Sequence, residues 1–255
     1  MSLAAIALAG FLAAGPQPGA PAAMQVSGSH STDVKFSWVG SYYAARAQGA
    51  SAVLPQADPK LDPPGVGHSL AEVAVQAAGQ QQVVEVGWTV DSAEGDLLPH
   101  LFVFAWVNGQ GLGYDCCGYV QTGHSWAPGD HVRPGVSARY GIRQQDGRWW
   151  ISYQGRRIGY YPDSLWGGRF VHAQVSQAFG EVASNGPTGT QMIDGRTDRE
   201  ISSFRLLGAR TPAATFYAPK SRATYRMGRH GRRWFYLGGH CRFSAGGRGA
   251  WPASG

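Results

Sequence analysis

The sequence has 255 residues, a formal net charge of +6 and only 15% charged residues, together with 37 glycines and 12% aromatic residues. This length, with 43% apolar residues, allows one sizeable domain with a hydrophobic core. The chain shows no sequence motif of a nucleic-acid-binding protein, so no nucleic acid is expected as a partner. Abundant glycine and aromatic residues favour many short strands joined by tight turns.

The first 23 residues are predicted to be a signal peptide. Residues 2–14 form an apolar run that is too short to cross a bilayer as a stable helix. A zone rich in proline and small residues follows up to Ala23 and offers a cleavage site. We therefore expect a secreted, extracellular protein, and no other segment is apolar enough to span a membrane.

Residues 24–65 are predicted to be an irregular N-terminal lead-in that wraps the domain. This segment is rich in proline, alanine and glycine and carries little strand signal. The pattern changes after it, and residues 66–255 are expected to form one domain. Its C-terminal part, from Arg210 onward, holds nine basic and no acidic residues. That part could contact an acidic polymer or an anionic lipid, or could simply be solvated.

The domain itself reads as a series of short strands. Residues 70–76 alternate between apolar and polar side chains, residues 83–90 form a clear period-two strand, and residues 101–107 are an unbroken apolar run. Further strands are expected at 117–121, 132–142, 147–153, 156–160, 170–182 and 200–207. Hairpin turns are expected at Asn108-Gly109, Asp146-Gly147 and Gln154-Gly155. This rhythm predicts an all-β fold, an antiparallel, jelly-roll-like β-sandwich of two stacked sheets.

The chain has three cysteines, Cys116, Cys117 and Cys241. Adjacent cysteines rarely bond to each other, so in an exported protein one of the first two could pair with Cys241. A metal site is the rival interpretation, although no Cys-x-x-Cys motif supports it. The eight histidines show no paired metal spacing, and His100 is expected to be a surface or core residue.

Two of the five glutamates lie inside otherwise apolar strands. Glu85 sits on the strand face opposite to Val84, Val86 and Trp88, which look like core. Glu181 follows Gly180 near the end of a long strand. Gly87 and Gly180 are expected to leave room beside the two carboxylates for a peptide backbone.

Strand interiors disfavour glutamate, so each placement needs a reason. Either carboxylate alone could be solvated or paired with an arginine. If both faced one surface and shared a water, repulsion and burial would keep one protonated while the other accepted a proton. Such a pair hydrolyses peptide or glycosidic bonds without a metal or a nucleophile.

Several segments resemble the neprosin family (the DUF239 proteins) in the same order along the chain. Residues 85–90 (EVGWTV) are similar to the family's E-A-G-W-x-V, and residues 117–121 (CGYVQ) to its C-x-G-F-V-Q. Further similar segments are 68–75 (HSLAEVAV), 101–106 (LFVFAW), 146–150 (DGRWW), 159–166 (GYYPDSLW), 179–182 (FGEV), 187–190 (PTGT) and 235–239 (FYLGG). The resemblance covers roughly residues 66–241 and identifies the chain as a short form without the plant pro-domain.

The resemblance implies a glutamic peptidase of the prolyl endopeptidase kind, which needs no metal or other cofactor. It places Glu85 and Glu181 in the two catalytic positions without deciding which is the acid and which is the base. One carboxylate would activate a water, and the other, protonated, would polarise the scissile carbonyl and assist the leaving nitrogen. The expected partner is a proline-rich polypeptide substrate, and the expected pH optimum is acidic.

Two departures from the family pattern stand out. Residues 114–117 (YDCC) keep the second cysteine of the family's loop and displace the first, and Phe179 replaces a glycine and could narrow the cleft. Substrate-binding roles are expected for Trp88, Tyr160, Tyr161 and Gly180, since rings stack on proline or sugar and a glycine admits a backbone.

Two other functions compete with the peptidase. One is a non-catalytic binding module for glycan or cell-wall polymer that uses the aromatic residues and the basic segment. The other is a glycosidase built on the same carboxylates. The placement of Glu85 and Glu181 discriminates, because a catalytic pair must face one surface with carboxylates within about 10 Å.

Overall fold

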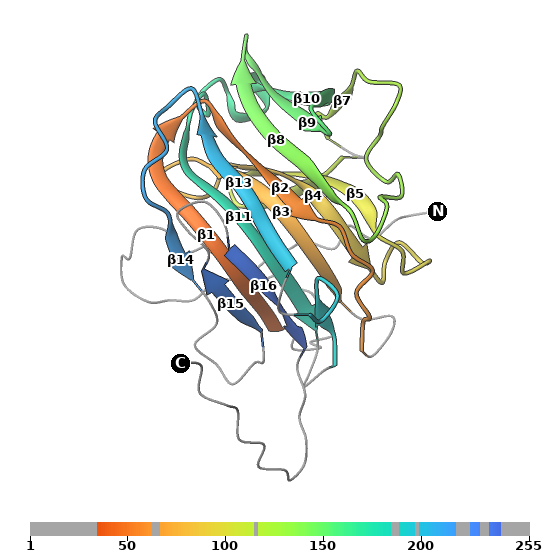
Figure 1. The fold of residues 1–255 in the computed structure, drawn as a ribbon. Helices are drawn as coiled ribbons and strands as arrows, with labels where there is room; N and C mark the ends of the chain where they lie inside the picture. Colours follow the sequence, from red (N-terminus) through yellow and green to blue (C-terminus); the bar gives the residue numbers. More distant parts are fainter. Residues whose placement is uncertain are drawn as a thin grey trace.

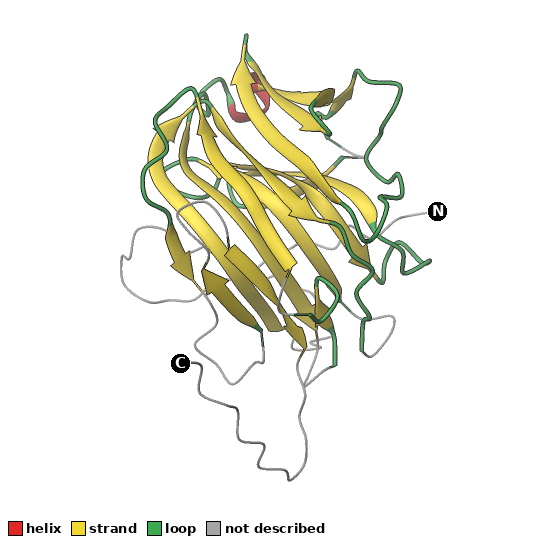
Figure 2. Cartoon of the chain, in the orientation of Figure 1, coloured by secondary structure: helices red, strands yellow, loops and turns green. Residues whose placement is uncertain are grey.

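The computed structural model describes residues 35–62, 67–114, 117–184, 189–196, 199–217, 225–229 and 235–240. The regular secondary structure of this part is β-strand, apart from one short 3-10 helix at Asp163–Trp166 (Figure 2). The strands form two antiparallel sheets, so the predicted all-β sandwich is confirmed. No helix within these residues is long and apolar enough to cross a membrane. The predicted signal peptide, residues 1–23, lies outside the described residues.

The first sheet has seven strands and carries both predicted catalytic glutamates. Its order across the sheet is β14, β1, β11, β3, β4, β5 and β6 (Figure 1). The bounds are β1 Lys35–Ala47, β3 His68–Gln76, β4 Val83–Asp91, β5 His100–Val107, β6 Gln110–Gly113, β11 Ala173–Ser184 and β14 Thr215–Tyr217. β3 therefore lies between β4, which carries Glu85, and β11, which carries Glu181.

The second sheet has nine strands and covers one face of the first. Its order is β12, β16, β13, β2, β8, β9, β10 and β7, and β15 pairs with β16. The bounds are β2 Gly49–Pro55, β7 Val120–Gln121, β8 Ser137–Gln145, β9 Arg148–Tyr153, β10 Arg156–Pro162, β12 Gln191–Met192, β13 Arg199–Leu207, β15 Arg226–Arg229 and β16 Phe235–His240. The basic segment after Arg210 contributes β14 to the first sheet and β15 and β16 to the second. Phe235 and Leu237 of β16 are buried in the core.

The three predicted hairpin turns are confirmed. In each turn both central residues have positive φ, as two-residue type I′ hairpins require. The φ values are 53° and 77° at Asn108-Gly109, 53° and 71° at Asp146-Gly147, and 51° and 78° at Gln154-Gly155. These turns join β5 to β6, β8 to β9 and β9 to β10.

Residues 35–55, predicted as part of an irregular lead-in, form β1 and β2 instead. Each is an interior strand of its sheet. β2 has weak strand propensity, yet its Ala50 and Ala52 are fully buried where the sheets pack closely. The chain changes sheets at Gly49, where a Cβ would lie 2.0 Å from the Ile142 carbonyl oxygen. Packing of small side chains therefore accounts for β2, whereas β1 contains Phe36, Trp38 and Val39, residues with high strand propensity.

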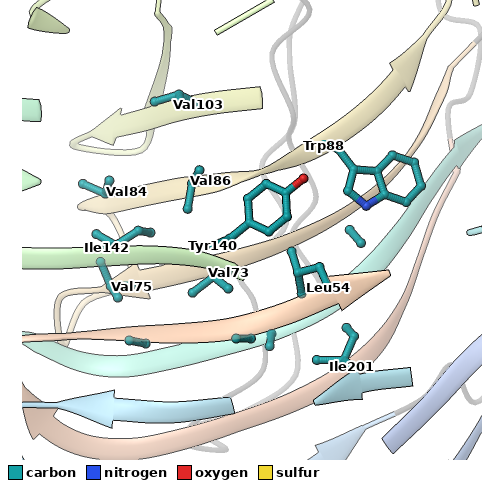
Figure 3. Packing of buried hydrophobic residues seen from close by; sticks show 14 of the residues in the cluster. Leu54, Val73, Val75, Val84, Val86, Trp88, Val103, Tyr140, Ile142 and Ile201 are labelled. Carbon is teal, nitrogen blue, oxygen red and sulfur yellow. The ribbon is translucent and has the colours of Figure 1, made fainter. Parts of the chain in front are cut away.

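The main hydrophobic core fills the space between the two sheets. Valines of β3, β4 and β5 meet large side chains of the second sheet (Figure 3). The labelled residues of this core are Leu54, Val73, Val75, Val84, Val86, Trp88, Val103, Tyr140, Ile142 and Ile201. Since successive strand residues point to opposite faces, the residues between these valines point to the outer face of the first sheet.

Candidate active site

Both predicted catalytic glutamates lie on the outer face of the first sheet. On β4, Glu85 alternates with Val84 and Val86, which are in the main core. On β11, Glu181 precedes Val182, which is also in the main core. The two carboxylates therefore share one face, which is one of the two conditions for a catalytic pair.

A third glutamate, Glu72 of β3, lies between them. It is the cross-strand partner of Phe179 on β11 and of Gly87 on β4. Glu181 and Glu85 are each two residues from those partners, so Glu72 is a diagonal neighbour of both, at about 7–8 Å between Cα atoms. Glu85 and Glu181 are two strands and four residues apart, about 16 Å between Cα atoms. Glu72 thus occupies the middle of the span between the two predicted residues.

Glu181 is held by two donors from neighbouring strands. Its Oε1 is 2.8 Å from Nε2 of His68, and its Oε2 accepts a hydrogen bond from the indole nitrogen of Trp38. On the other side of its ring, His68 Nδ1 lies 3.9 Å from an Asp91 carboxylate oxygen. Burial opposes the charged imidazolium, but the hydrogen bond to Glu181 and the charges of Glu181 and Asp91 outweigh it and raise the pKa of His68. The Glu181 carboxyl group is therefore within hydrogen-bond distance of two nitrogen atoms, one at each oxygen.

Glu85 is held in the protonated state. Burial raises the pKa of Glu85 to about 8; a hydrogen bond from Trp106 opposes this rise, and the charge of Glu181 adds to it. The Trp106 indole nitrogen lies 3.1 Å from Oε1, while Oε2 has no hydrogen-bond partner. Glu85 is therefore a carboxylic acid at neutral and acidic pH.

Glu72 is the most isolated of the three carboxyls. It is fully buried, and neither of its oxygens has a hydrogen-bond partner among the residues that the structure describes. Burial, followed by the charges of Glu85 and Glu181, raises the pKa of Glu72 well above its usual value. Sequence analysis missed this residue because it falls in the ordinary alternation of residues 70–76. Glu72 and Glu85 both occupy positions that alternate with apolar residues, on two strands that follow each other in the sequence. This shared pattern was the signal that could have revealed Glu72.

Aromatic and aliphatic side chains surround the carboxyls on this face. The second apolar cluster consists of Leu70, Ala74, Val83, Phe104, Trp106 and Phe179, with Trp38, Phe102 and Tyr217 packed against it. Two glycines make the space for the bulky members. A Cβ at Gly40 would lie 2.3 Å from the Cβ of Phe179, and one at Gly87 would lie 2.7 Å from the Cβ of Glu72. Gly87, expected to make room beside Glu85, instead makes room for Glu72.

The four predicted substrate-binding residues lie away from this face. Trp88 and Tyr161 are fully buried in the main core, and the Trp88 indole nitrogen donates to the Pro55 carbonyl at 2.8 Å. Gly180 also faces inward, where a Cβ would lie 2.8 Å from Leu237 Cδ1. Strand alternation explains both placements. Trp88 is two residues from Val86 and therefore points to the same, core-facing side of β4, and Gly180 is next to Glu181 and therefore points to the opposite face.

Tyr160, the fourth of these residues, lies on the outer face of the second sheet. Its ring is 4.9 Å from that of Trp150, and the Arg148 guanidinium lies 5.0 Å from its centroid. It cannot contact a substrate bound at the glutamates, because the whole sandwich separates the two outer faces.

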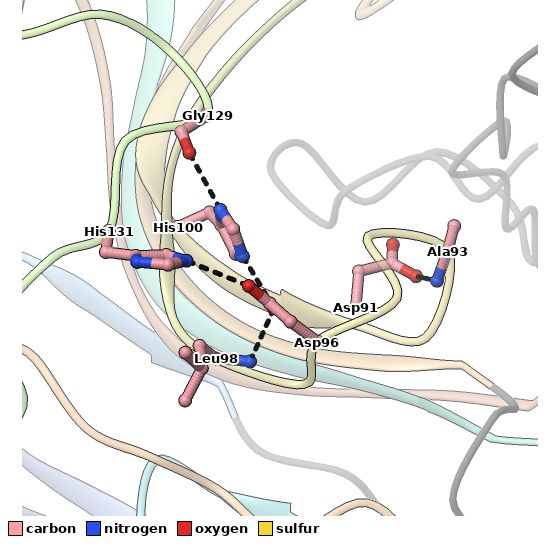
Figure 4. Close-up of polar contacts among 7 residues, drawn as sticks. All are labelled: Asp91, Ala93, Asp96, Leu98, His100, Gly129 and His131. Atoms are coloured by element: carbon pink, nitrogen blue, oxygen red, sulfur yellow. Dashed lines mark hydrogen bonds and ion pairs between the residues drawn. The ribbon is translucent and has the colours of Figure 1, made fainter.

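A separate group of metal-ligand side chains lies where the β4–β5 loop meets β5. Asp96, His100 and His131 place their ligand atoms within 4.8 Å of one another (Figure 4). His100 was expected to be an ordinary surface or core residue, so its long-range partner His131 is a finding of the structure.

The close approach of β3 and β4 gives the first prediction. Gly87→Ala places a methyl group 2.1 Å from the Ala71 carbonyl oxygen and 2.7 Å from Glu72 Cβ. We expect it to lower the free energy of unfolding by about 1–3 kcal/mol or more, measured by chemical denaturation. Gly79→Ala is the matched control, since nothing lies within 4 Å of its Cβ. Equal stability of both variants would contradict the close packing around Glu72.

The raised pKa of Glu85 gives a prediction about stability. Between its usual value of 4.5 and about 8, the unfolded chain has lost this proton and the folded chain keeps it. The free energy of unfolding must therefore fall as pH rises through this window, by about 1.4 kcal/mol per pH unit for one such group. Glu72 acts in the same direction.

Glu85→Gln cannot titrate, so denaturation curves across this pH range should fall less steeply than those of the wild type, by about that slope. Glu94→Gln, at an exposed loop position, serves as the control and should keep the wild-type slope. A Glu85→Gln curve parallel to the wild type would mean that Glu85 is ionised in the folded protein.

The chain matches one family model and is similar to several solved structures. A family model described as Neprosin matches residues 66–205, more than half of the chain. Among solved structures, SCP-B, a member of the eqolisin family of peptidases in complex with the tripeptide Ala-Ile-His, is similar with 9% identity and a TM-score of 0.46, covering 81% of this chain and 99% of that chain.

Scytalido-glutamic peptidase with a peptide-based transition state analog is similar with 10% identity, the same coverage and the same TM-score of 0.46. A carbohydrate-binding module from Bacillus subtilis has 11% identity and a TM-score of 0.30, covering 61% of this chain and 80% of that chain. The family match, which runs from just before β3 to near the end of β13, shows that the chain belongs to the neprosin family.

Proposed function

We propose that this protein is a secreted glutamic endopeptidase in which Glu181 is the general base and Glu85 the general acid. The observation that carries the proposal is the sheet face on which three buried carboxyls interact, one provided with donors and two held protonated. This is the division of roles that peptide hydrolysis by two carboxyls needs.

Glu181 suits the base because its surroundings stabilise its anion. Trp38 donates to one oxygen and His68 lies at hydrogen-bond distance from the other. Each oxygen retains a further lone pair, which can accept a proton from a water. That water would attack the scissile carbonyl carbon as its proton passes to Glu181.

Glu85 suits the acid because it keeps its proton up to a pH of about 8. Its O–H would donate to the carbonyl oxygen as negative charge develops there. When the tetrahedral intermediate collapses, the C–N bond breaks and the leaving nitrogen takes a proton from the acid. Transfer of the proton that Glu181 received from water to the ionised Glu85 then restores the starting state.

Glu72 would act as a neutral hydrogen-bond donor between the other two. It lies on the diagonal that joins them, and both of its oxygens are free of protein partners. A protonated carboxyl in this position can donate to the oxyanion without losing its proton. It also bridges a span that Glu85 and Glu181 alone would leave wide.

A preference for proline is supported by the apolar, aromatic character of the face. Trp38, Phe102 and Tyr217 pack beside the buried apolar cluster that surrounds the carboxyls. Rings of this kind pack well against a pyrrolidine ring. Proline also lacks a backbone N–H, so it leaves no unsatisfied donor when it is bound against apolar side chains.

Secretion is supported by cysteine chemistry. Cys117 is disulfide-bonded, and its partner lies outside the described residues, as both Cys116 and Cys241 do. Stable disulfides form in oxidising, extracellular compartments. The bond agrees with export by the predicted signal peptide.

The proposal predicts which substitutions abolish proteolysis. Glu85→Gln and Glu181→Gln should each lower kcat/KM on a proline-rich protein by roughly 10²–10⁴, the usual contribution of general acid–base catalysis. Wild-type activity should also decline as pH rises through about 8, where Glu85 ionises. Product formation can be followed by mass spectrometry, with Glu94→Gln as a control of full activity.

Cleavage that survives both substitutions would remove these residues from the mechanism. If the wild type cleaves nothing but all variants bind a glycan or cell-wall polymer equally, the protein is a binding module rather than a peptidase.

The role of Glu72 can be tested separately. Glu72→Gln keeps an N–H donor and cannot ionise, so it should retain most of the activity. Glu72→Leu removes the donor and should lower kcat by roughly 10²–10³, as loss of an oxyanion donor does. Circular dichroism checks that both variants are folded. A Glu72→Gln variant as inactive as Glu181→Gln would show that Glu72 transfers a proton instead.

A further inference from the structure

Asp96, His100 and His131 converge from three parts of the chain at one edge of the sandwich. Asp96 lies in the β4–β5 loop, His100 begins β5, and His131 forms a backbone bridge with His100. Nε2 of His100 is 2.9 Å from one Asp96 carboxylate oxygen, and Nε2 of His131 is 2.8 Å from the other (Figure 4). Two imidazoles and a carboxylate thus point at a common centre.

The orientation of His100 is fixed by its other ring nitrogen. Nδ1 lies 2.8 Å from the Gly129 carbonyl oxygen, which can only accept a hydrogen bond. Nδ1 therefore carries a proton, and in the neutral ring Nε2 has the free lone pair. An outer carbonyl that fixes the tautomer in this way is the usual partner of a metal-bound histidine. His100 is buried, so its ring is also held by packing.

The backbone around the cluster is preorganised. The Leu101 N–H donates to the Asp130 carbonyl at 2.7 Å, and the Val132 N–H donates to the Pro99 carbonyl at 2.8 Å, on either side of His131. The Leu98 N–H donates to an Asp96 carboxylate oxygen at 2.9 Å. Hydrogen bonds therefore fix the positions of all three residues.

We propose that these three residues bind one divalent transition-metal ion of the Zn²⁺ class. Imidazole nitrogen with a carboxylate oxygen is a donor set that zinc accepts, whereas Ca²⁺ and Mg²⁺ prefer oxygen ligands alone.

The space needed for the ion is small. Tetrahedral zinc with bonds of about 2.0–2.1 Å holds its ligand atoms about 3.3 Å apart. The two nitrogen–oxygen distances, 2.9 and 2.8 Å to different Asp96 oxygens, are about half an ångström shorter than this, and all ligand atoms lie within 4.8 Å of one another, so a small movement of the exposed His131 side chain is enough to seat the ion. Three protein ligands leave the fourth position to water.

The ion would clip the β4–β5 loop to the segment that precedes β8. His100 is the cross-strand partner of Thr89, which pairs with Leu70, which pairs with Glu181. The ion would therefore be bound at the β5 end of the row of cross-strand partners that has Glu181 at its β11 end. The proposed acid and base do not depend on this ion.

Binding can be measured directly on the full chain, freed of metal with a chelator and of any affinity tag. Isothermal titration with Zn²⁺ at neutral pH should give about one ion per chain, and Co²⁺ should give the visible absorption of a tetrahedral site. His131→Ala and Asp96→Asn should each weaken Zn²⁺ binding by more than roughly 10–100-fold, the cost of losing even an outer partner. His124→Ala and His172→Ala, outside the cluster, should bind as the wild type does.

A second measurement guards against misfolded variants. Zn²⁺ should raise the Tm of the wild type and leave that of His131→Ala unchanged, while the metal-free proteins should melt alike because His131 is exposed. Absence of Zn²⁺ binding by the wild type, or unaltered binding by His131→Ala, would overturn the proposal.

Discussion

Burial of three carboxyl groups on one sheet face is the constraint on which the rest of the structure depends. An ionised carboxylate removed from water costs several kcal/mol unless donors compensate it, and three neighbours cannot all be ionised. The protein supplies donors to Glu181 through Trp38 and His68 and leaves Glu72 without any. Protonation states are thereby set by the fold itself, before any substrate arrives.

The register of β11, β3 and β4 creates this arrangement. The alternation that sends Val84 and Val86 into the core sends Glu85 to the outer face, and the same holds for Glu72 between Ala71 and Val73. A slip of one residue would exchange the two faces and bury a carboxylate among the valines. Core formation and assembly of the site are therefore one event, and a sequence that packs this core has already placed its carboxyls.

Much of the fold could be predicted from local patterns. Alternation located most strands, and dipeptides such as Asn108-Gly109 located the hairpins with their turn type. The strand face of Glu85 followed from periodicity, because alternation along one strand decides which side chains share a face without knowledge of the neighbouring strands. The association of Glu85 with Glu181 needed the family resemblance, since pairing across strands is a long-range property.

The failures have physical causes as well. Trp88 was expected to contact the substrate, although strand alternation puts it on the same face as the core valines. Its aromatic character alone does not distinguish a core residue from a surface residue. Trp38 was missed although Phe36, Trp38 and Val39 of β1 are residues with strong strand propensity, because the proline, alanine and glycine content of the whole segment 24–65 masked this local signal. The contact between Asp96 and His131 joins two loops, and no spacing rule registers such a contact.

The placement of β1 and β2 bears on where an independently folding unit ends. The family match begins at residue 66, yet β1 covers one edge of β11 and supplies Trp38 to Glu181. β2 lies between β13 and β8, so its removal would split the second sheet into two pieces. A fragment cut to the matched segment would expose unpaired strand edges, which favour aggregation. The boundary of a usable expression fragment is therefore set by backbone pairing and lies upstream of Lys35.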